Sequence, residues 1–135
     1  MNEEEARKHY IHLKTLREHV HKLQTSIQEL DEQTRTIQEM KEAITQAETL
    51  PEGSEILAPI SNGVFIQATS KPVNKLLLNV GANTVIEQTP TEAKNLLEEQ
   101  LRELDTYRKK LYTQQQELAQ QAQAIEQQVA EELDV

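Results

Sequence analysis

Every residue that disfavours helix most strongly lies in the middle of this chain. Its three Gly and four Pro all fall between residues 50 and 90 of the 135. The flanking segments, 1–49 and 91–135, contain neither type and are rich in Glu, Gln, Leu, Lys and Ala, which favour helix. This distribution predicts two long helices separated by a segment that is not helical.

Both flanking segments repeat apolar residues about every 3.5 positions, which is typical of a left-handed coiled coil. The first series is Ala6, Leu13, Val20, Ile27, Thr34 and Lys41, interleaved with His9, Leu16, Leu23, Leu30, Ile37 and Ile44. The second is Leu97, Leu104, Leu111, Leu118 and Ile125, interleaved with Leu101, Arg108, Gln115, Ala122 and Val129. Two helices of similar length joined by one segment predict an antiparallel hairpin. Arg108 and Lys41 are polar at seam positions, where such residues usually set the register.

The middle segment predicts two β-hairpins. The four expected strands are 55–60 (EILAPI), 64–69 (VFIQAT), 75–80 (KLLLNV) and 84–88 (TVIEQ). Ser61-Asn62-Gly63 and Gly81-Ala82-Asn83 are the expected turns, since Asn and Gly tolerate positive φ. Thr89, Pro90 and Glu92 together form a capping-box signal for the start of the second helix.

The apolar strands need a cover, because isolated hairpins are marginal in water. We expect the apolar stripes of the two helices to pack against each other and to leave the strands uncovered. The sequence therefore predicts assembly through the strands, with a copy or with a related chain. A monomer whose hairpins fold back on the helix ends is the alternative.

Composition argues against several classes of function. The net charge of −9 disfavours nucleic acid and anionic membranes, and no apolar run is long enough to span a bilayer. The absence of Cys excludes thiolate sites and fits a reducing cytoplasm. His9 and His12 share a helix face, but no third ligand lies near them, so we expect no metal. No nucleophile–base arrangement or phosphate-binding loop is present, and we expect neither enzymatic activity nor a cofactor.

Taken together, these features resemble the alpha class of prefoldin subunits over the whole chain. The resemblance is carried by the heptad seams, by LPEGSEILAPI at 50–60, by SNGVF at 61–65 and by KLLLNVGANTVIEQTPTEA at 75–93. Two hairpins favour the alpha class, because the beta class is described with one. The implied fold is mainly α: a single domain (1–135) with helices at 1–49 and 91–135 and an oligomerisation module at 50–90.

The resemblance also implies a function. Prefoldin is a hexamer of two alpha and four beta subunits whose hairpins build a double β-barrel platform. It holds non-native client proteins without ATP and passes them to a group II chaperonin. The implied platform residues are Ile56, Leu57, Ile60, Val64, Ile66, Leu76, Leu77, Leu78, Val80, Val85 and Ile86. The implied client-binding residues, at the free helix ends, are Tyr10, Ile11, Leu13, Ile125, Val129 and Leu133.

Two other functions compete with this expectation. A coiled-coil spacer would oligomerise through the same strands without binding clients. A helical arm that grips transfer RNA would carry a basic stripe, which the acidic balance of the chain disfavours.

Overall fold

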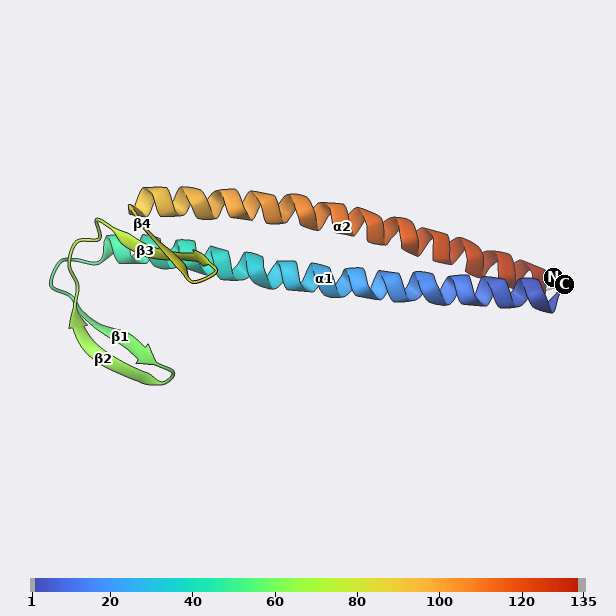
Figure 1. Cartoon of the computed structure of the whole chain (residues 1–135), viewed down its shortest axis with the longest axis horizontal. Coiled ribbons are helices and arrows are strands. Elements are labelled where there is room, and N and C mark those ends of the chain that lie inside the picture. The colour runs from blue at the N-terminus through green and yellow to red at the C-terminus, as the bar shows by residue number, and fades with distance from the viewer. Residues whose placement is uncertain (1, 134–135) are drawn as a thin grey trace. The chain divides into compact units, whose positions relative to one another are not determined.

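The chain forms a long helix, then four short strands, and then a second long helix (Figure 1). The computed structural model describes residues 2–133, and their side chains up to residue 132. The elements are α1 (Glu3–Thr49), β1 (Glu55–Ser61), β2 (Val64–Thr69), β3 (Leu76–Gly81), β4 (Thr84–Gln88) and α2 (Pro90–Leu133). The predicted element order is confirmed, and the ends of the four predicted strands shift by no more than one residue. The predicted outer ends of the helices, at residues 1 and 135, lie outside the described residues.

Side-chain caps begin both helices. The amide of Glu5 donates to Asn2 Oδ1 at 2.8 Å at the start of α1, where three Glu residues complement the helix dipole. The amide of Glu92 donates to Thr89 Oγ1 at 3.2 Å at the start of α2. The Thr89 cap predicted from the sequence is therefore confirmed, whereas Asn2 was not predicted.

Each hairpin pairs two antiparallel strands that are neighbours in sequence. In β1–β2, Ile56 lies opposite Ala68 and Ala58 opposite Ile66. In β3–β4, Leu76 lies opposite Gln88 and Leu78 opposite Ile86.

Both turns need left-handed backbone, which explains their composition. Gly63 has a φ of 77°, and Gly81, Ala82 and Asn83 have φ of 103°, 51° and 59°. Gly and Asn accept this conformation readily, whereas Ala82 adopts it at some cost.

The chain divides into two compact units. Unit 1 comprises residues 1–34 and 102–135, in which the first part of α1 and the last part of α2 lie side by side (Figure 1). Arg17 pairs with Glu126 and Arg108 with Asp31, so the two helix segments are antiparallel. The core of unit 1 consists of Leu23, Ile27, Leu30 and Leu111, with Leu104 and Leu118 packed against it.

Unit 2 comprises residues 35–101, which include both hairpins. Its core consists of Ile44, Leu78, Ala93 and Leu97, with Ile37, Met40, Leu76, Ile86 and Leu96 packed around them. Leu97 is only 1% exposed. Three of these residues come from β3–β4, so one face of that hairpin packs on the helices. The expectation that the helices leave the strands uncovered is therefore wrong for β3–β4. This hairpin packs on the helices, as in the alternative in which the hairpins fold back on the helix ends.

Candidate functional site

The predicted seam residues form the contact between the helices within each unit. Of the two heptad series, only Ala6 is exposed, and the others are buried or half-buried. Ala122 is buried and Gln115 half-buried, although neither is a large apolar residue. The period of the sequence thus correctly indicates which stripe of each helix faces its neighbour.

The two charged seam residues both have carboxylate partners. Arg108 Nε donates to Asp31 Oδ1 at 2.6 Å in unit 1, and Lys41 pairs with Glu98 in unit 2. The hydrogen bond to Asp31, and then its negative charge, raise the pKa of the Arg108 guanidinium above its usual value. These pairs join residues far apart in sequence, so they fit the register-setting role expected of polar seam residues.

A second polar contact in unit 1 joins α2 to α1 in the same antiparallel pairing as Arg108 and Asp31. Gln115 Nε2 donates to Gln24 Oε1 at 2.8 Å. Nearby, Val20 lines a hollow of about 390 Å³ together with Ala119 and Ala122. The small Ala side chains leave this part of the seam loosely filled.

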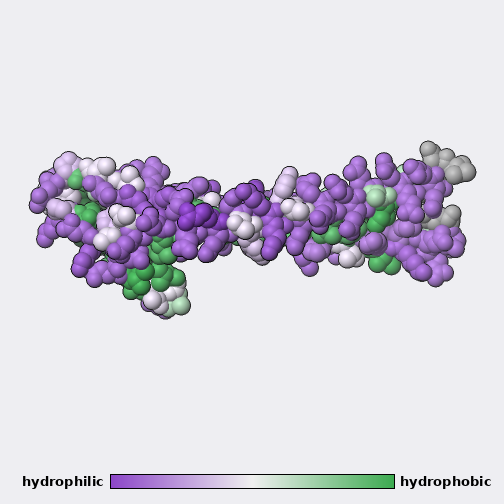
Figure 2. Space-filling model, turned by 90° about the horizontal axis from the view of Figure 1, so that it is seen from above, coloured by the Kyte–Doolittle hydropathy of each residue, from purple (hydrophilic) through white to green (hydrophobic). Residues whose placement is uncertain are grey.

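The expected platform residues differ in their exposure. Leu78 is buried, and Ile56, Leu76 and Ile86 are half-buried. The remaining seven are exposed: Leu57, Ile60, Val64, Ile66, Leu77, Val80 and Val85. Hydrophobic surface accordingly gathers over the β segment (Figure 2). Phe65, which we did not predict, is also 56% exposed and adds an aromatic ring to β2.

The β1–β2 hairpin is fastened at its base by hydrogen bonds. Ser70 is the buried polar residue of this region, and its hydroxyl donates to the Pro51 carbonyl at 2.8 Å. The Ser70 hydroxyl oxygen also accepts from the Ser54 amide at 3.0 Å, and the Ser70 amide donates to the Ser54 carbonyl at 2.9 Å. We call these contacts the Ser70 latch. They tie the end of β2 to the loop that follows α1, a role that no local sequence signal indicated.

The residues expected to bind clients lie at the start of α1 and near the end of α2. Tyr10 and Ile11 are 67% and 56% exposed. Leu13, Ile125 and Val129 are half-buried in the seam of unit 1. The side chain of Leu133 lies outside the described residues. Unit 1 thus combines freely exposed apolar side chains with others that the seam half covers.

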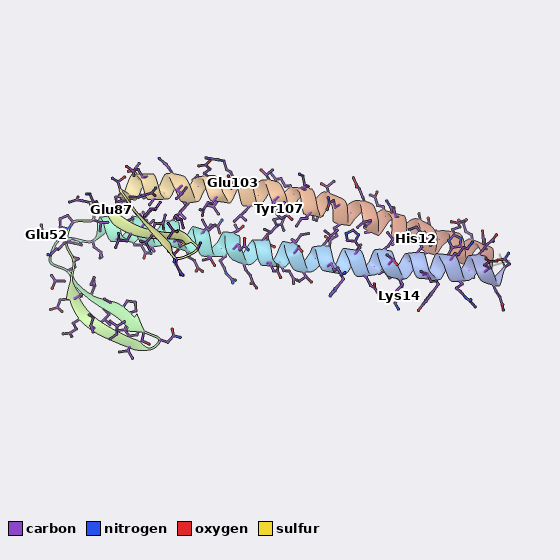
Figure 3. The ribbon with its side chains drawn as sticks, viewed as in Figure 1. His12, Lys14, Glu52, Glu87, Glu103 and Tyr107 are labelled. Carbon is purple, nitrogen blue, oxygen red and sulfur yellow. The ribbon has the colours of Figure 1, made fainter. Side chains whose placement is uncertain are left out.

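Tyr10 and Leu13 line an open groove along α1. The groove has a volume of about 440 Å³ and is completed by Lys14, Arg17, Glu18, His21 and Lys22. His12 and Lys14 project from different sides of α1 (Figure 3), and His12 does not line the groove. The groove lining therefore combines two apolar side chains, Tyr10 and Leu13, with side chains that are mostly basic.

The described part of the chain shows neither a metal-binding cluster nor a membrane-spanning helix. Residues 2–132 contain no group of three or more His, Cys, Asp or Glu side chains placed to hold a metal ion. In the same part of the chain, neither helix has a stretch apolar enough to cross a membrane.

Comparison with known proteins gives a consistent result. The family profile described as prefoldin subunit matches residues 16–134. A prefoldin subunit alpha from Archaeoglobus fulgidus is 25% identical over 129 residues, which cover 96% of this chain and 94% of the relative. A prefoldin subunit alpha from Thermofilum pendens is 36% identical over 62 residues, about half of either protein.

A solved structure has the same fold. The structure is a cryo-EM structure of filamentous PFD from Methanocaldococcus jannaschii, and its TM-score with this chain is 0.77. The match covers 90% of this chain and 98% of the other at 24% identity. Two long helices with two hairpins between them are thus an arrangement that both chains share.

Proposed function

Because this chain belongs to the prefoldin subunit family, we propose that it is the alpha-class subunit of an ATP-independent holding chaperone. Membership of this family implies a chaperone rather than an enzyme. We further propose a cytoplasmic complex of two such chains with four beta subunits. Its role is to hold non-native proteins and pass them to a group II chaperonin.

The observation that carries the proposal is the exposed apolar surface of the hairpins. Leu57, Phe65 and Leu77 are each more than half exposed on short strands. Burying one such side chain contributes about 1.5–3 kcal/mol, so a partner that covers several of them is strongly favoured. Strands with free edges add backbone hydrogen bonds to the same interface. The eleven platform residues named above are proposed to lie at or beneath this interface.

Client binding is proposed for the helix segments of unit 1. Tyr10 and Ile11 offer apolar contacts directly, and Leu13, Ile125 and Val129 become available where the seam opens. Such contacts are weak and non-directional, which suits clients of unrelated sequence. Several subunits that act on one client would gain affinity through effective concentration.

The experiment is an aggregation assay of a chemically denatured client without nucleotide. The chain, mixed with a beta-class partner, is expected to slow aggregation and to form a complex of six chains by native mass spectrometry. Assembly without any slowing of aggregation would contradict the holding function and support a coiled-coil spacer. A lone, stable monomer in the presence of the partner would contradict the proposed platform.

A further inference from the structure

Positive charge is concentrated in one stretch of α1. Between Glu5 and Glu29 the sole carboxylate is Glu18, although the chain as a whole has a net charge of −9. The same stretch holds all four His and five of the 14 Lys and Arg residues. These five are Arg7, Lys8, Lys14, Arg17 and Lys22. This part of the chain therefore has the opposite charge to the rest.

The groove along α1 lies within this stretch. Tyr10 and Leu13 supply its apolar surface, and Lys14, Arg17 and Lys22 supply three cations against the one carboxylate of Glu18. Tyr10 is 67% exposed, so its ring is open to contact from outside. The groove thus offers an apolar contact next to an excess of positive charge.

Two of these three cations are available to a ligand. Arg17 is engaged by Glu126 of α2. Within the described part of the chain, neither Lys14 nor Lys22 takes part in a salt bridge. An acidic ligand would therefore gain attraction to two ammonium groups without displacing a carboxylate of this chain.

We propose that this groove binds acidic segments of polypeptide that carry an apolar anchor, and that it biases the chain toward non-native proteins with such segments. The anchor contacts Tyr10 and Leu13, while carboxylates on its flanks pair with Lys14 and Lys22. This inference rests on the holding function proposed above and adds a class of client to it.

The charge distribution favours a peptide over a nucleic acid. Carboxylates flank the basic stretch in the sequence. Glu3, Glu4 and Glu5 precede it, and Glu29, Asp31 and Glu32 follow it. A regular row of phosphates longer than the stretch would meet these groups and be repelled. A short acidic segment fits between them, and its apolar side chain uses the groove surface that a phosphate backbone would leave empty.

The test compares two labelled peptides that bind the full-length chain, measured by fluorescence anisotropy. One peptide consists of Leu, Phe and Glu residues, and in the other every Glu is replaced by Lys. At low salt the acidic peptide is expected to bind about tenfold more tightly, and the preference is expected to shrink as salt rises. Equal affinity for both peptides would overturn the inference.

A pair of double variants assigns the preference to the groove. Lys14→Glu/Lys22→Glu is expected to abolish or invert the preference. Arg102→Glu/Lys110→Glu is the matched control, since it changes the net charge equally at exposed positions of α2 in the same unit. An equal loss in both variants would attribute the effect to net charge and overturn the inference. Circular dichroism checks that the variants remain helical, and the comparison of peptides on the unmodified chain does not depend on them.

Two further measurements, with an oligonucleotide and with a denatured client, distinguish the ways in which the inference could be wrong. A single-stranded oligonucleotide that binds the groove more tightly than the acidic peptide would overturn the inference in favour of nucleic acid. A denatured client that is held without any discrimination between the peptides would refute the acidic preference alone. A client that aggregates at its unassisted rate, with neither peptide bound, would refute the holding function as well.

Discussion

The two hairpins have similar length and composition, but they are held in place differently. β3–β4 buries Leu78 and half-buries Leu76 and Ile86 against the helices of unit 2. β1–β2 buries none of its large apolar side chains and is fastened at its base by the Ser70 latch. Apolar strands therefore do not by themselves determine whether a hairpin packs within its own chain.

The two hairpins therefore differ in role: β3–β4 stabilises the fold of the chain, and β1–β2 is available for assembly with other chains. Side chains on the inner face of β3–β4 stabilise the fold of unit 2, whereas those of β1–β2 remain available to another chain. The following substitutions test that division, and all free energies refer to the chain at a dilution where it is monomeric.

Leu78→Ala has the largest expected effect. Removing a buried Leu side chain is expected to lower the free energy of unfolding by about 2–4 kcal/mol, from lost burial and from the cavity left behind. Urea denaturation measures the change. Leu77→Ala is the matched control, because Leu77 is the neighbouring residue and is 78% exposed. Similar losses in the two variants would show that the hairpin does not pack as described.

Ser70→Ala is expected to lower the free energy of unfolding by about 1 kcal/mol, because the Ser54 amide and the Pro51 carbonyl each lose one hydrogen bond but keep the 3.2 Å bond between them. Hydrogen exchange should show faster opening at the Ser54 and Gly53 amides, with little change in β3–β4. Ser61→Ala, at an exposed position in the same hairpin, serves as the control. Unchanged exchange at Ser54 would mean that the latch does not hold the hairpin.

Leu57→Ser is expected to change the free energy of unfolding by less than about 0.5 kcal/mol, because Leu57 is exposed in the chain. Assembly with partner subunits should weaken markedly, and analytical ultracentrifugation measures this. A stable, fully assembled variant would place Leu57 outside the proposed interface.

Lys75→Ala has the smallest expected effect. Lys75 Nζ lies 3.6 Å from Glu87 Oε1 across β3–β4, and both side chains are largely exposed. Such pairs contribute little, so the loss should be less than about 0.5 kcal/mol and should shrink further at high salt. A loss comparable to that of Leu78→Ala would show that charge, rather than burial, holds this hairpin.

The sequence predicts well whatever depends on local pattern. The heptad period identifies the seam, the Gly and Asn residues identify the turns, and Thr89 identifies the start of α2. It predicts poorly whatever depends on distant segments. Leu76, Leu78 and Val80 alternate alike, yet only Leu78 is buried, because the position of β3 against Ile44 and Leu97 decides the outcome.

The candidate site follows the same rule. The resemblance implies Tyr10 and Ile11 as client-binding residues, and both lie outside the heptad series and are exposed. Ser70 gave no signal, since its partners Pro51 and Ser54 are brought to it only by the hairpin. The partner of Arg108 is 77 residues away at Asp31, and a single sequence does not pair the two.

The antiparallel seam also implies an order of folding. Lys41 and Glu98 are separated by 57 residues along the chain, whereas Arg17 and Glu126 are separated by 109. Closing the longer loop first would cost about 0.6 kcal/mol more in chain entropy. The hairpins need only local contacts and form soonest. We therefore expect the helices to pair first near Lys41 and Glu98, and the segments that hold Arg17 and Glu126 to pair last and separate first.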